Sequence, residues 1–126
     1  MVFLNCGSRN ETPETSGAAH FLEHLHFKGT SKRRREQLEL DVENMGGQLN
    51  AYTSRENTSY TLNAFKHNVP EALEILGDML LNSTYENSYL TTERNTIYAE
   101  LLETQKEQME ALVEHAHFNV NIFFFH

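Results

Sequence analysis

Two histidines and a glutamate are spaced so that a single helix can present them together. His20, Glu23 and His24 form the pattern H-x-x-E-H. Four helical steps of about 100° nearly complete a turn, so both imidazoles lie on one face and can bind one metal ion. Glu23 is offset by roughly 60° and can reach a water molecule on that ion instead. The pattern predicts a helix that carries part of a hydrolytic zinc site. The alternative is a coincidence of polar residues on an amphipathic helix.

A catalytic zinc ion usually has three protein ligands and one open position for water, so a distant segment must supply another ligand. A long helix predicted from residue 88 to about 114 is the best source, because its glutamates recur at helical spacing. The stripe consists of Glu93, Glu100, Glu103, Glu107, Glu110 and Glu114. Like charges at these spacings repel by a few tenths of a kcal/mol per pair. A metal ion or a cationic ligand could offset that repulsion, and the alternative is a solvated helix face.

The rest of the pattern predicts an α+β fold. Gly29 and the pair Gly46-Gly47 mark helix ends, and Pro70 suits the first turn of a helix. Alternation and β-type residues predict two strands joined by a short polar turn. The predicted elements are a strand at 2–6, a loop at 7–17, helices at 18–27, 34–45 and 70–81, and strands at 48–53 and 58–65. The apolar stripe of the helix at 70–81 is Ala72, Leu73, Ile75, Leu76, Met79 and Leu80. We expect an antiparallel sheet with helices packed on one face.

Charge and composition exclude several classes of partner. The chain has 18 acidic and 10 basic residues and a formal net charge of −8, so it should repel nucleic acid and anionic membranes. The basic run at 32–35 is more typical of a solvated helix start than of a nucleic-acid patch. Cys6 is the single cysteine, no apolar run is long enough for a transmembrane segment, and the N-terminus has no signal or transit segment.

Separate segments of the chain, in the right order, resemble one peptidase family. They are Gly7-Ser8-Arg9, residues 20–30 (HFLEHLHFKGT), residues 49–57 (LNAYTSREN) and the helix around Glu93 and Glu100. Over about residues 3–117 they resemble the pitrilysin-type zinc peptidases, or inverzincins, and within them the β subunits of mitochondrial processing peptidases. The resemblance implies an N-terminal zinc-peptidase domain at 1–117 and a divergent tail at 118–126.

The resemblance also implies roles for the residues of the metal site. His20, His24 and Glu100 would hold one Zn²⁺ per chain; Glu100 lies 76 positions after His24. Glu23 would be the general base, and later the proton donor to the leaving amine. Glu93, seven residues before Glu100 and therefore within about 20° of it on a helix, would support the site from outside the ligand set.

The substrate implied by the resemblance is a basic mitochondrial presequence. Asn50, Ala51 and Tyr52 would form an edge strand to which an extended peptide adds. Phe27 would be a wall for the side chain after the cleaved bond, although an ordinary core phenylalanine is the alternative. Glu110 and Glu114 would hold an arginine before that bond. The family likeness further implies a mitochondrial location, in the matrix or at the inner membrane, and a heterodimer with an α-type subunit.

Members of this family are several times longer and close a second half or a partner over the site. We therefore expect a truncated chain that binds zinc but cleaves presequences weakly or not at all by itself. Two alternatives stay open. The chain could be a structural core subunit of the respiratory ubiquinol–cytochrome c reductase, which shares the fold, or an inactive truncated fragment.

Overall fold

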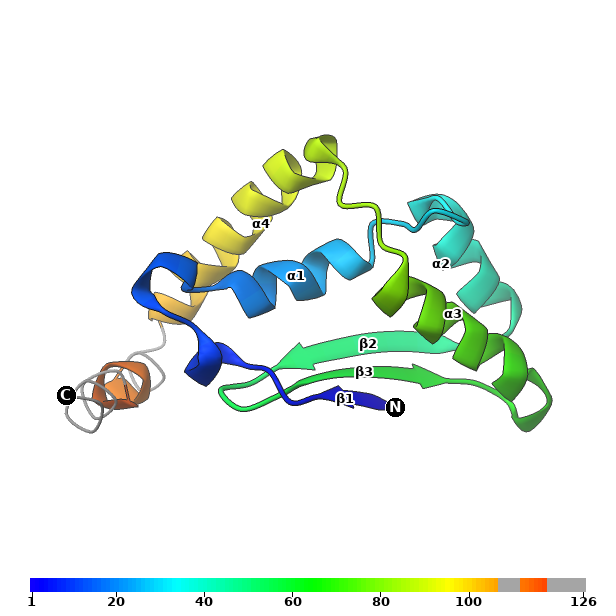
Figure 1. Cartoon of the computed structure of the whole chain (residues 1–126), viewed down its shortest axis with the longest axis horizontal. Helices are drawn as coiled ribbons and strands as arrows, with labels where there is room; N and C mark the ends of the chain where they lie inside the picture. The colour runs from blue at the N-terminus through cyan, green and yellow to red at the C-terminus, as the bar shows by residue number, and fades with distance from the viewer. Residues whose placement is uncertain (107–111, 118–126) are drawn as a thin grey trace. The chain divides into compact units, whose positions relative to one another are not determined.

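Strands and helices follow one another in the predicted order in the computed structural model, which describes residues 1–106 and 112–117 (Figure 1). The chain forms one compact unit from Met1 to Glu93 and a second that begins at Arg94. The main elements are β1 (Val2–Leu4), α1 (Ala18–His26), α2 (Arg35–Asn44), β2 (Gln48–Thr53), β3 (Thr58–Asn63), α3 (Val69–Leu81) and α4 (Asn87–Lys106). Short 3-10 turns lie at Ser8–Asn10, Pro13–Thr15 and Lys66–Asn68.

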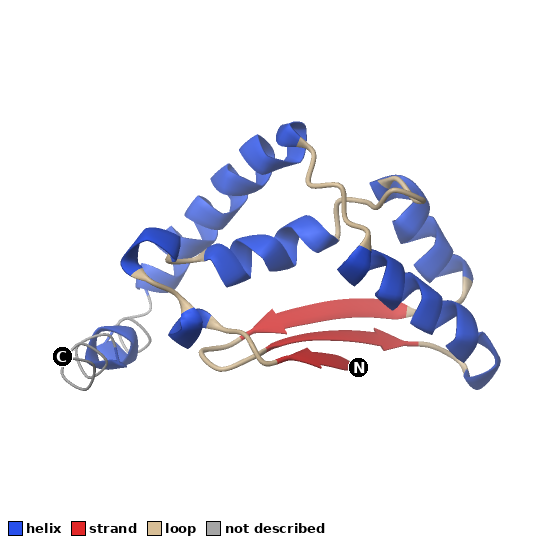
Figure 2. Cartoon of the chain, viewed as in Figure 1, coloured by secondary structure: helices blue, strands red, loops and turns tan. Residues whose placement is uncertain are grey.

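The sheet is antiparallel, in the order β1-β3-β2. β3 lies in the middle, where Thr58 pairs with Leu4 on one side and with Thr53 on the other. α1 and α2 contact β2, and α3 contacts β3. These helices all lie on the same side of the sheet (Figure 2). The predicted α+β fold, an antiparallel sheet with helices on one face, is confirmed. Among the described residues, β2 has a strand partner on one side only.

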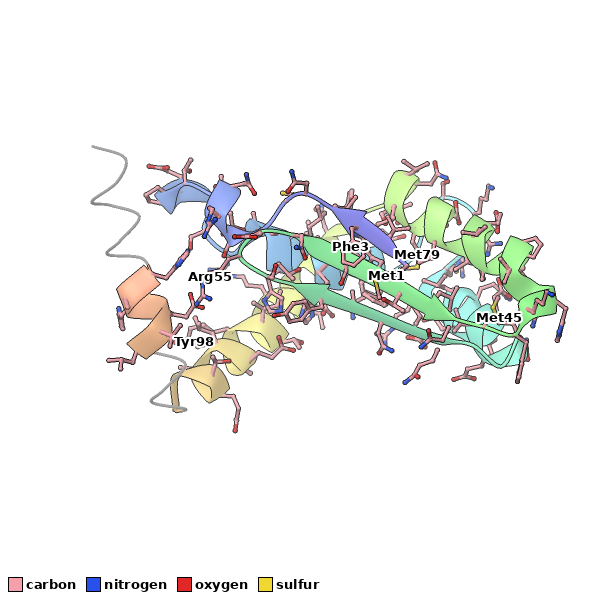
Figure 3. All side chains as sticks on the ribbon, turned by 90° about the horizontal axis from the view of Figure 1, so that it is seen from below. Met1, Phe3, Met45, Arg55, Met79 and Tyr98 are labelled. Carbon is pink, nitrogen blue, oxygen red and sulfur yellow. The ribbon has the colours of Figure 1, made fainter. Side chains whose placement is uncertain are left out.

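The core of the first unit lies between α2, α3 and the helix-covered face of the sheet. Its buried members are Leu38, Val42, Met45, Ala72, Ile75 and Met79, with Phe27, Leu49, Leu62 and Ala64 packed against them. Met45 and Met79 are labelled in Figure 3, which looks from below, toward the face of the sheet that carries the exposed Phe3. The predicted stripe of α3 is wrong at Leu73, which is 60% exposed, because it lies beside the buried face that Ala72, Ile75 and Met79 define.

Gly7 fixes the turn between β2 and β3. It is buried, and a Cβ atom there would lie 2.4 Å from the Ser54 carbonyl oxygen. The following amides of Ser8 and Arg9 donate hydrogen bonds to the carbonyls of Ser54 (3.2 Å) and Arg55 (2.8 Å). The segment Gly7-Ser8-Arg9 therefore braces the end of the hairpin through backbone contacts that leave no space for a side chain at residue 7.

α1 has defined ends. The Glu11 carboxylate accepts hydrogen bonds from the backbone amides of Gly17 (2.7 Å) and Ala19 (2.8 Å), where the helix dipole favours negative charge. After the helix, Gly29 adopts a φ of 117°, which only glycine tolerates well. The turns of α1 that carry His20 and His24 thus lie between a capped start and a glycine stop.

The basic run at 32–35 binds carboxylates of the same chain. Arg33 contacts Asp41 (2.9 Å), Asp78 (3.0 Å) and Glu74. Lys32 pairs with Glu74 and Arg35 with Glu39. These ion pairs occupy side chains that a nucleic-acid patch would present. In the described part of the chain, no helix combines the length and hydrophobicity that crossing a bilayer requires.

Candidate metal centre

The imidazoles of His20 and His24 face each other on α1. Their Nε2 atoms are 3.2 Å apart, and the rings meet edge to face with an interplanar angle of 86°. Both side chains are half-buried. This is the arrangement that the spacing of four residues predicted, because each residue of the pair stands one helical turn from the other.

Glu93 fixes the tautomer of His24. Its Oε2 lies 3.2 Å from Nδ1 of His24, and a carboxylate can only accept, so Nδ1 carries the proton and donates. In the neutral imidazole the lone pair then lies on Nε2, the atom that faces His20. A carboxylate behind a histidine in this way is the usual support of a metal-binding imidazole.

Lys28 stabilises the buried negative charge of Glu93. Its ammonium group donates to Oε1 of Glu93 at 2.8 Å, and only 6% of the Glu93 side chain is exposed. Burial alone would raise the pKa of Glu93, but the hydrogen bonds and charges of Lys28 and His24 outweigh burial and lower this pKa. Glu93 therefore stays ionised at neutral pH. Lys28 was missed at the sequence level, because nothing in the spacing pairs residues 28 and 93.

The pair of imidazoles fits a tetrahedral metal ion. With metal–nitrogen bonds of about 2.0–2.1 Å, two ligands of such an ion lie roughly 3.3 Å apart. The 3.2 Å separation of the two Nε2 atoms is close to this value. Neutral imidazoles supported by a carboxylate are ligands that zinc binds well. His20 and His24 could therefore hold such an ion together.

Glu23 precedes His24 on α1, and a residue of the sheet donates a hydrogen bond to its carboxylate. The hydroxyl of Thr53, the last residue of β2, donates a hydrogen bond to Oε2 of Glu23. Both residues are half-buried. A carboxylate next to a metal site can take a proton from water, which is the chemistry predicted for Glu23. Thr53 lay within the segment that resembled the family, but no role was predicted for it.

The predicted glutamates beyond Glu93 follow the first compact unit in the sequence. Glu100 lies on α4, in the unit that begins at Arg94, and Glu114 is an exposed residue of the helical stretch 112–117. Glu110 lies outside the described residues. The roles of Glu100, Glu110 and Glu114 stay predictions.

The predicted substrate strand is β2. Asn50 and Tyr52 are exposed, Tyr52 at 65%, whereas Ala51 is half-buried and pairs with Tyr60 of β3. Phe27 follows α1, packs against the core and lines a cleft of about 270 Å³ together with Leu49 and the helix α2. The substrate-binding roles of Phe27, Asn50, Ala51 and Tyr52 stay predictions, and the contacts of Phe27 are also those of a core side chain.

His26 takes a structural position. It is 3% exposed and lies between the hydroxyls of Tyr60 (2.6 Å) and Tyr85 (3.1 Å). Burial lowers the pKa of His26, so it is neutral at neutral pH. Its direction away from His24 agrees with the expectation that it is a poor metal ligand, because the two residues are roughly 200° apart on the helix.

Known proteins are similar to this chain in sequence and in fold. The chain is 52% identical over 116 residues to the mitochondrial-processing peptidase subunit beta of Neurospora crassa, a match that covers 92% of this chain and 24% of that protein. It is 49% identical, with the same coverage, to the ubiquinol-cytochrome-c reductase complex core protein I, mitochondrial, of Euglena gracilis. A crystal structure of a protease from Helicobacter pylori matches with a TM-score of 0.77 and 30% identity, over 81% of this chain and 24% of that one.

The chain thus spans about a quarter of the length of these relatives. A family model described as insulinase (peptidase family M16) matches residues 1–122, nearly the whole sequence. This agrees with the resemblance that the separate sequence segments predicted. The chain belongs to the insulinase family of peptidases, family M16.

Proposed function

We propose that this chain is the metal-binding part of a zinc metalloendopeptidase that hydrolyses basic mitochondrial presequences. The observation that carries the proposal is the pair of Nε2 atoms of His20 and His24 at 3.2 Å, with His24 fixed by Glu93. A general base candidate, Glu23, lies one residue away from His24 on the same helix. The relatives named mitochondrial-processing peptidase subunit beta support the substrate class and a mitochondrial location.

Glu100 is the proposed third ligand. It follows Glu93 by seven residues on the continuous helix α4, and seven helical steps return to within about 20° of the same direction. A helix face that presents Glu93 to His24 therefore presents Glu100 two turns further on. With His20 and His24 it offers two imidazole nitrogens and one carboxylate oxygen, a set that suits zinc and leaves one position open.

The protein's own groups would move the protons of the reaction. A bound zinc ion supplies polarisation of a water molecule, whose pKa falls to about 7. Glu23 would accept a proton from the attacking water as the water oxygen bonds to the scissile carbonyl carbon. Glu23 would then deliver that proton to the amide nitrogen as the carbon–nitrogen bond breaks, and the water's second proton would pass from the new carboxylic acid to the amine, which leaves a carboxylate and an ammonium group. Glu93 keeps His24 in the required tautomer throughout.

The free edge of β2 is the proposed substrate strand. An extended peptide could add to it through main-chain hydrogen bonds, with Asn50, Ala51 and Tyr52 setting the register. Glu110 and Glu114, with the overall charge of −8, would favour basic residues in the peptide. An α-type subunit is the proposed partner, because the relatives are named as β subunits.

Metal analysis tests the proposal first. We expect one zinc ion per chain in the wild type, and at least a tenfold loss of affinity in His20→Ala and in Glu100→Gln, because each removes a ligand. His67→Ala and Glu103→Gln are matched controls that should keep full affinity. Unchanged affinity in His20→Ala would exclude this site.

Hydrolysis of a basic presequence peptide, with and without an added α-type subunit, tests the activity. We expect cleavage with the partner and little or none without it, since the chain spans about a quarter of its relatives. Zinc binding with no cleavage under either condition would favour the second candidate, a structural core subunit of the ubiquinol–cytochrome c reductase. The Euglena gracilis relative, 49% identical, supports that candidate.

A further inference from the structure

Thr53 stands where the sheet meets the helix that carries the proposed base. It is the last residue of β2, and its hydroxyl contacts Oε2 of Glu23 across 30 positions of sequence. A carboxylate has no proton to donate when ionised, so the hydroxyl is the donor. This side-chain hydrogen bond connects the strand β2 directly to Glu23.

The hydroxyl of Thr53 has a single proton, and the neighbouring hydroxyl of Thr58 does not compete for it. Thr58, its partner across the hairpin, lies 3.4 Å away, oxygen to oxygen. Thr58 is buried and donates its own proton to the Cys6 carbonyl at 2.9 Å. The proton of Thr53 is therefore available to Glu23.

The backbone at Thr53 is held in place by the turn that follows. The Ser54 amide donates to the Asn57 carbonyl at 2.8 Å, and the Ser54 hydroxyl contacts the amide of Asn57 at 3.0 Å. The amide of Ser8, next to the buried Gly7, donates to the Ser54 carbonyl. A donor on such a braced turn can fix the position of the carboxylate that it contacts.

We propose that Thr53 is a positioning residue, which holds the Glu23 carboxylate in register with the strand that receives the substrate. The inference rests on the proposed function. Residues 50–52 of β2 would pair with the peptide, and the next residue holds the base, so one strand sets the position of both. A misplacement of about 1 Å between reacting groups can cost a hundredfold in rate. The hydrogen bond from Thr53 limits such displacement of the Glu23 carboxylate.

Paired variants of Thr53 test the inference in the zinc-loaded chain assembled with an α-type subunit. Thr53→Val keeps the shape but removes the donor, and Thr53→Ser keeps the donor. We expect Thr53→Val to lower kcat about tenfold or more with KM within about twofold, and Thr53→Ser to restore most of kcat. Thr61→Val makes the same change on the opposite face of the hairpin and should leave kcat unchanged. Equal kcat in Thr53→Val and the wild type would overturn the inference.

A second measurement does not depend on activity. Three-bond NMR couplings of Glu23 report its χ1 angle in the 126-residue chain itself. We expect one rotamer in the wild type and in Thr53→Ser, and averaging in Thr53→Val. Averaged couplings in the wild type would overturn the inference even if the valine variant does not fold. A wild-type assembly that never cleaves peptide, with one fixed Glu23 rotamer, would refute the proposed function and leave the role of Thr53 supported.

Discussion

Replacing Glu93 by glutamine should weaken zinc binding and destabilise the fold by separate routes. Glu93 holds two partners at once, Nζ of Lys28 at 2.8 Å and Nδ1 of His24 at 3.2 Å. Glutamine keeps the shape of the side chain and removes its charge. The His24 contact then loses its ionised acceptor, and Lys28 loses its counter-ion.

The distances and burial set the size of each effect. At an effective dielectric constant of about 20, unit charges 2.8 Å apart attract by about 6 kcal/mol, most of which offsets the cost of removing them from water. Breaking a fully buried pair costs about 3–5 kcal/mol. Because Lys28 is still 16% exposed, we expect a loss of roughly 2–3 kcal/mol in the free energy of unfolding. Loss of a carboxylate behind a metal-binding histidine lowers metal affinity about 10–100-fold.

A double-mutant cycle with Lys28→Met separates the two routes. Zinc affinity is measured by competition with a chromophoric chelator, and stability by urea unfolding of the metal-free chain. Adding Lys28→Met to Glu93→Gln should recover much of the stability, because no unpaired ammonium remains, but should not recover zinc affinity. Glu86→Gln, an exposed site just before α4, is the matched control and should change neither. Zinc affinity of Glu93→Gln within twofold of wild type would refute the role of Glu93 in orienting His24, and strictly additive stability changes would refute the pairing with Lys28.

Other substitutions test other parts of the structure. Gly7→Ala should cost about 2–4 kcal/mol of stability in urea unfolding, because its Cβ would lie 2.4 Å from the Ser54 carbonyl oxygen; a loss below about 1 kcal/mol would contradict the brace. Glu23→Gln should keep one zinc ion and abolish peptide cleavage by the assembled enzyme, and residual activity above about a tenth of wild type would exclude it as the base. Burial holds the pKa of His26 below the unfolded value of 6.5, so its neutral form contributes stability that is complete above that pH. Stability should therefore fall below about pH 6.5 by at most about 1.4 kcal/mol per pH unit, and more steeply in wild type than in His26→Phe; parallel profiles would contradict this.

The elements of the fold could be predicted because each has a local cause. The glycines at 29 and 46 follow α1 and α2, where the sequence predicted helix ends, and both adopt positive φ angles. Pro70 lies in the first turn of α3, and the polar residues 54–57 form the turn between two strands. These features depend on a few neighbouring residues and need no knowledge of the tertiary structure.

The contacts that position the candidate site residues could not be predicted from neighbouring residues in the sequence. Lys28 and Glu93 are 65 positions apart, and Glu23 and Thr53 are 30 apart. Whether such side chains meet depends on how α1 packs against its neighbours, and periodicity does not determine packing. Spacing also explained why His20 and His24 share a face, but not that a carboxylate would select the tautomer of one of them.

The sequence nevertheless contained one signal for Thr53, because the alternation of apolar residues along β2 stops there. Leu49 and Ala51 alternate toward the helix-covered face of β2, and the next inward position is a threonine instead of an apolar residue. A polar residue at an inward position requires a partner, and here the partner is Glu23. Polar residues at such inward positions are expected at functional sites, where the chemistry requires a polar group inside the fold.

A polar residue at an inward position does not by itself identify a functional site, as Asp78 shows. Asp78 lies among the buried residues of α3 and is 3% exposed, but its oxygens bind Thr30, Arg33 and Asn82. These contacts fasten the loop after α1 to α3. Glu93 differs because one of its partners is His24, whose Nε2 atom faces another imidazole. The distinction therefore lies in the chemistry of the partner: the partners of Asp78 connect the loop to α3, whereas the partner of Glu93 is an imidazole of the candidate metal-binding pair.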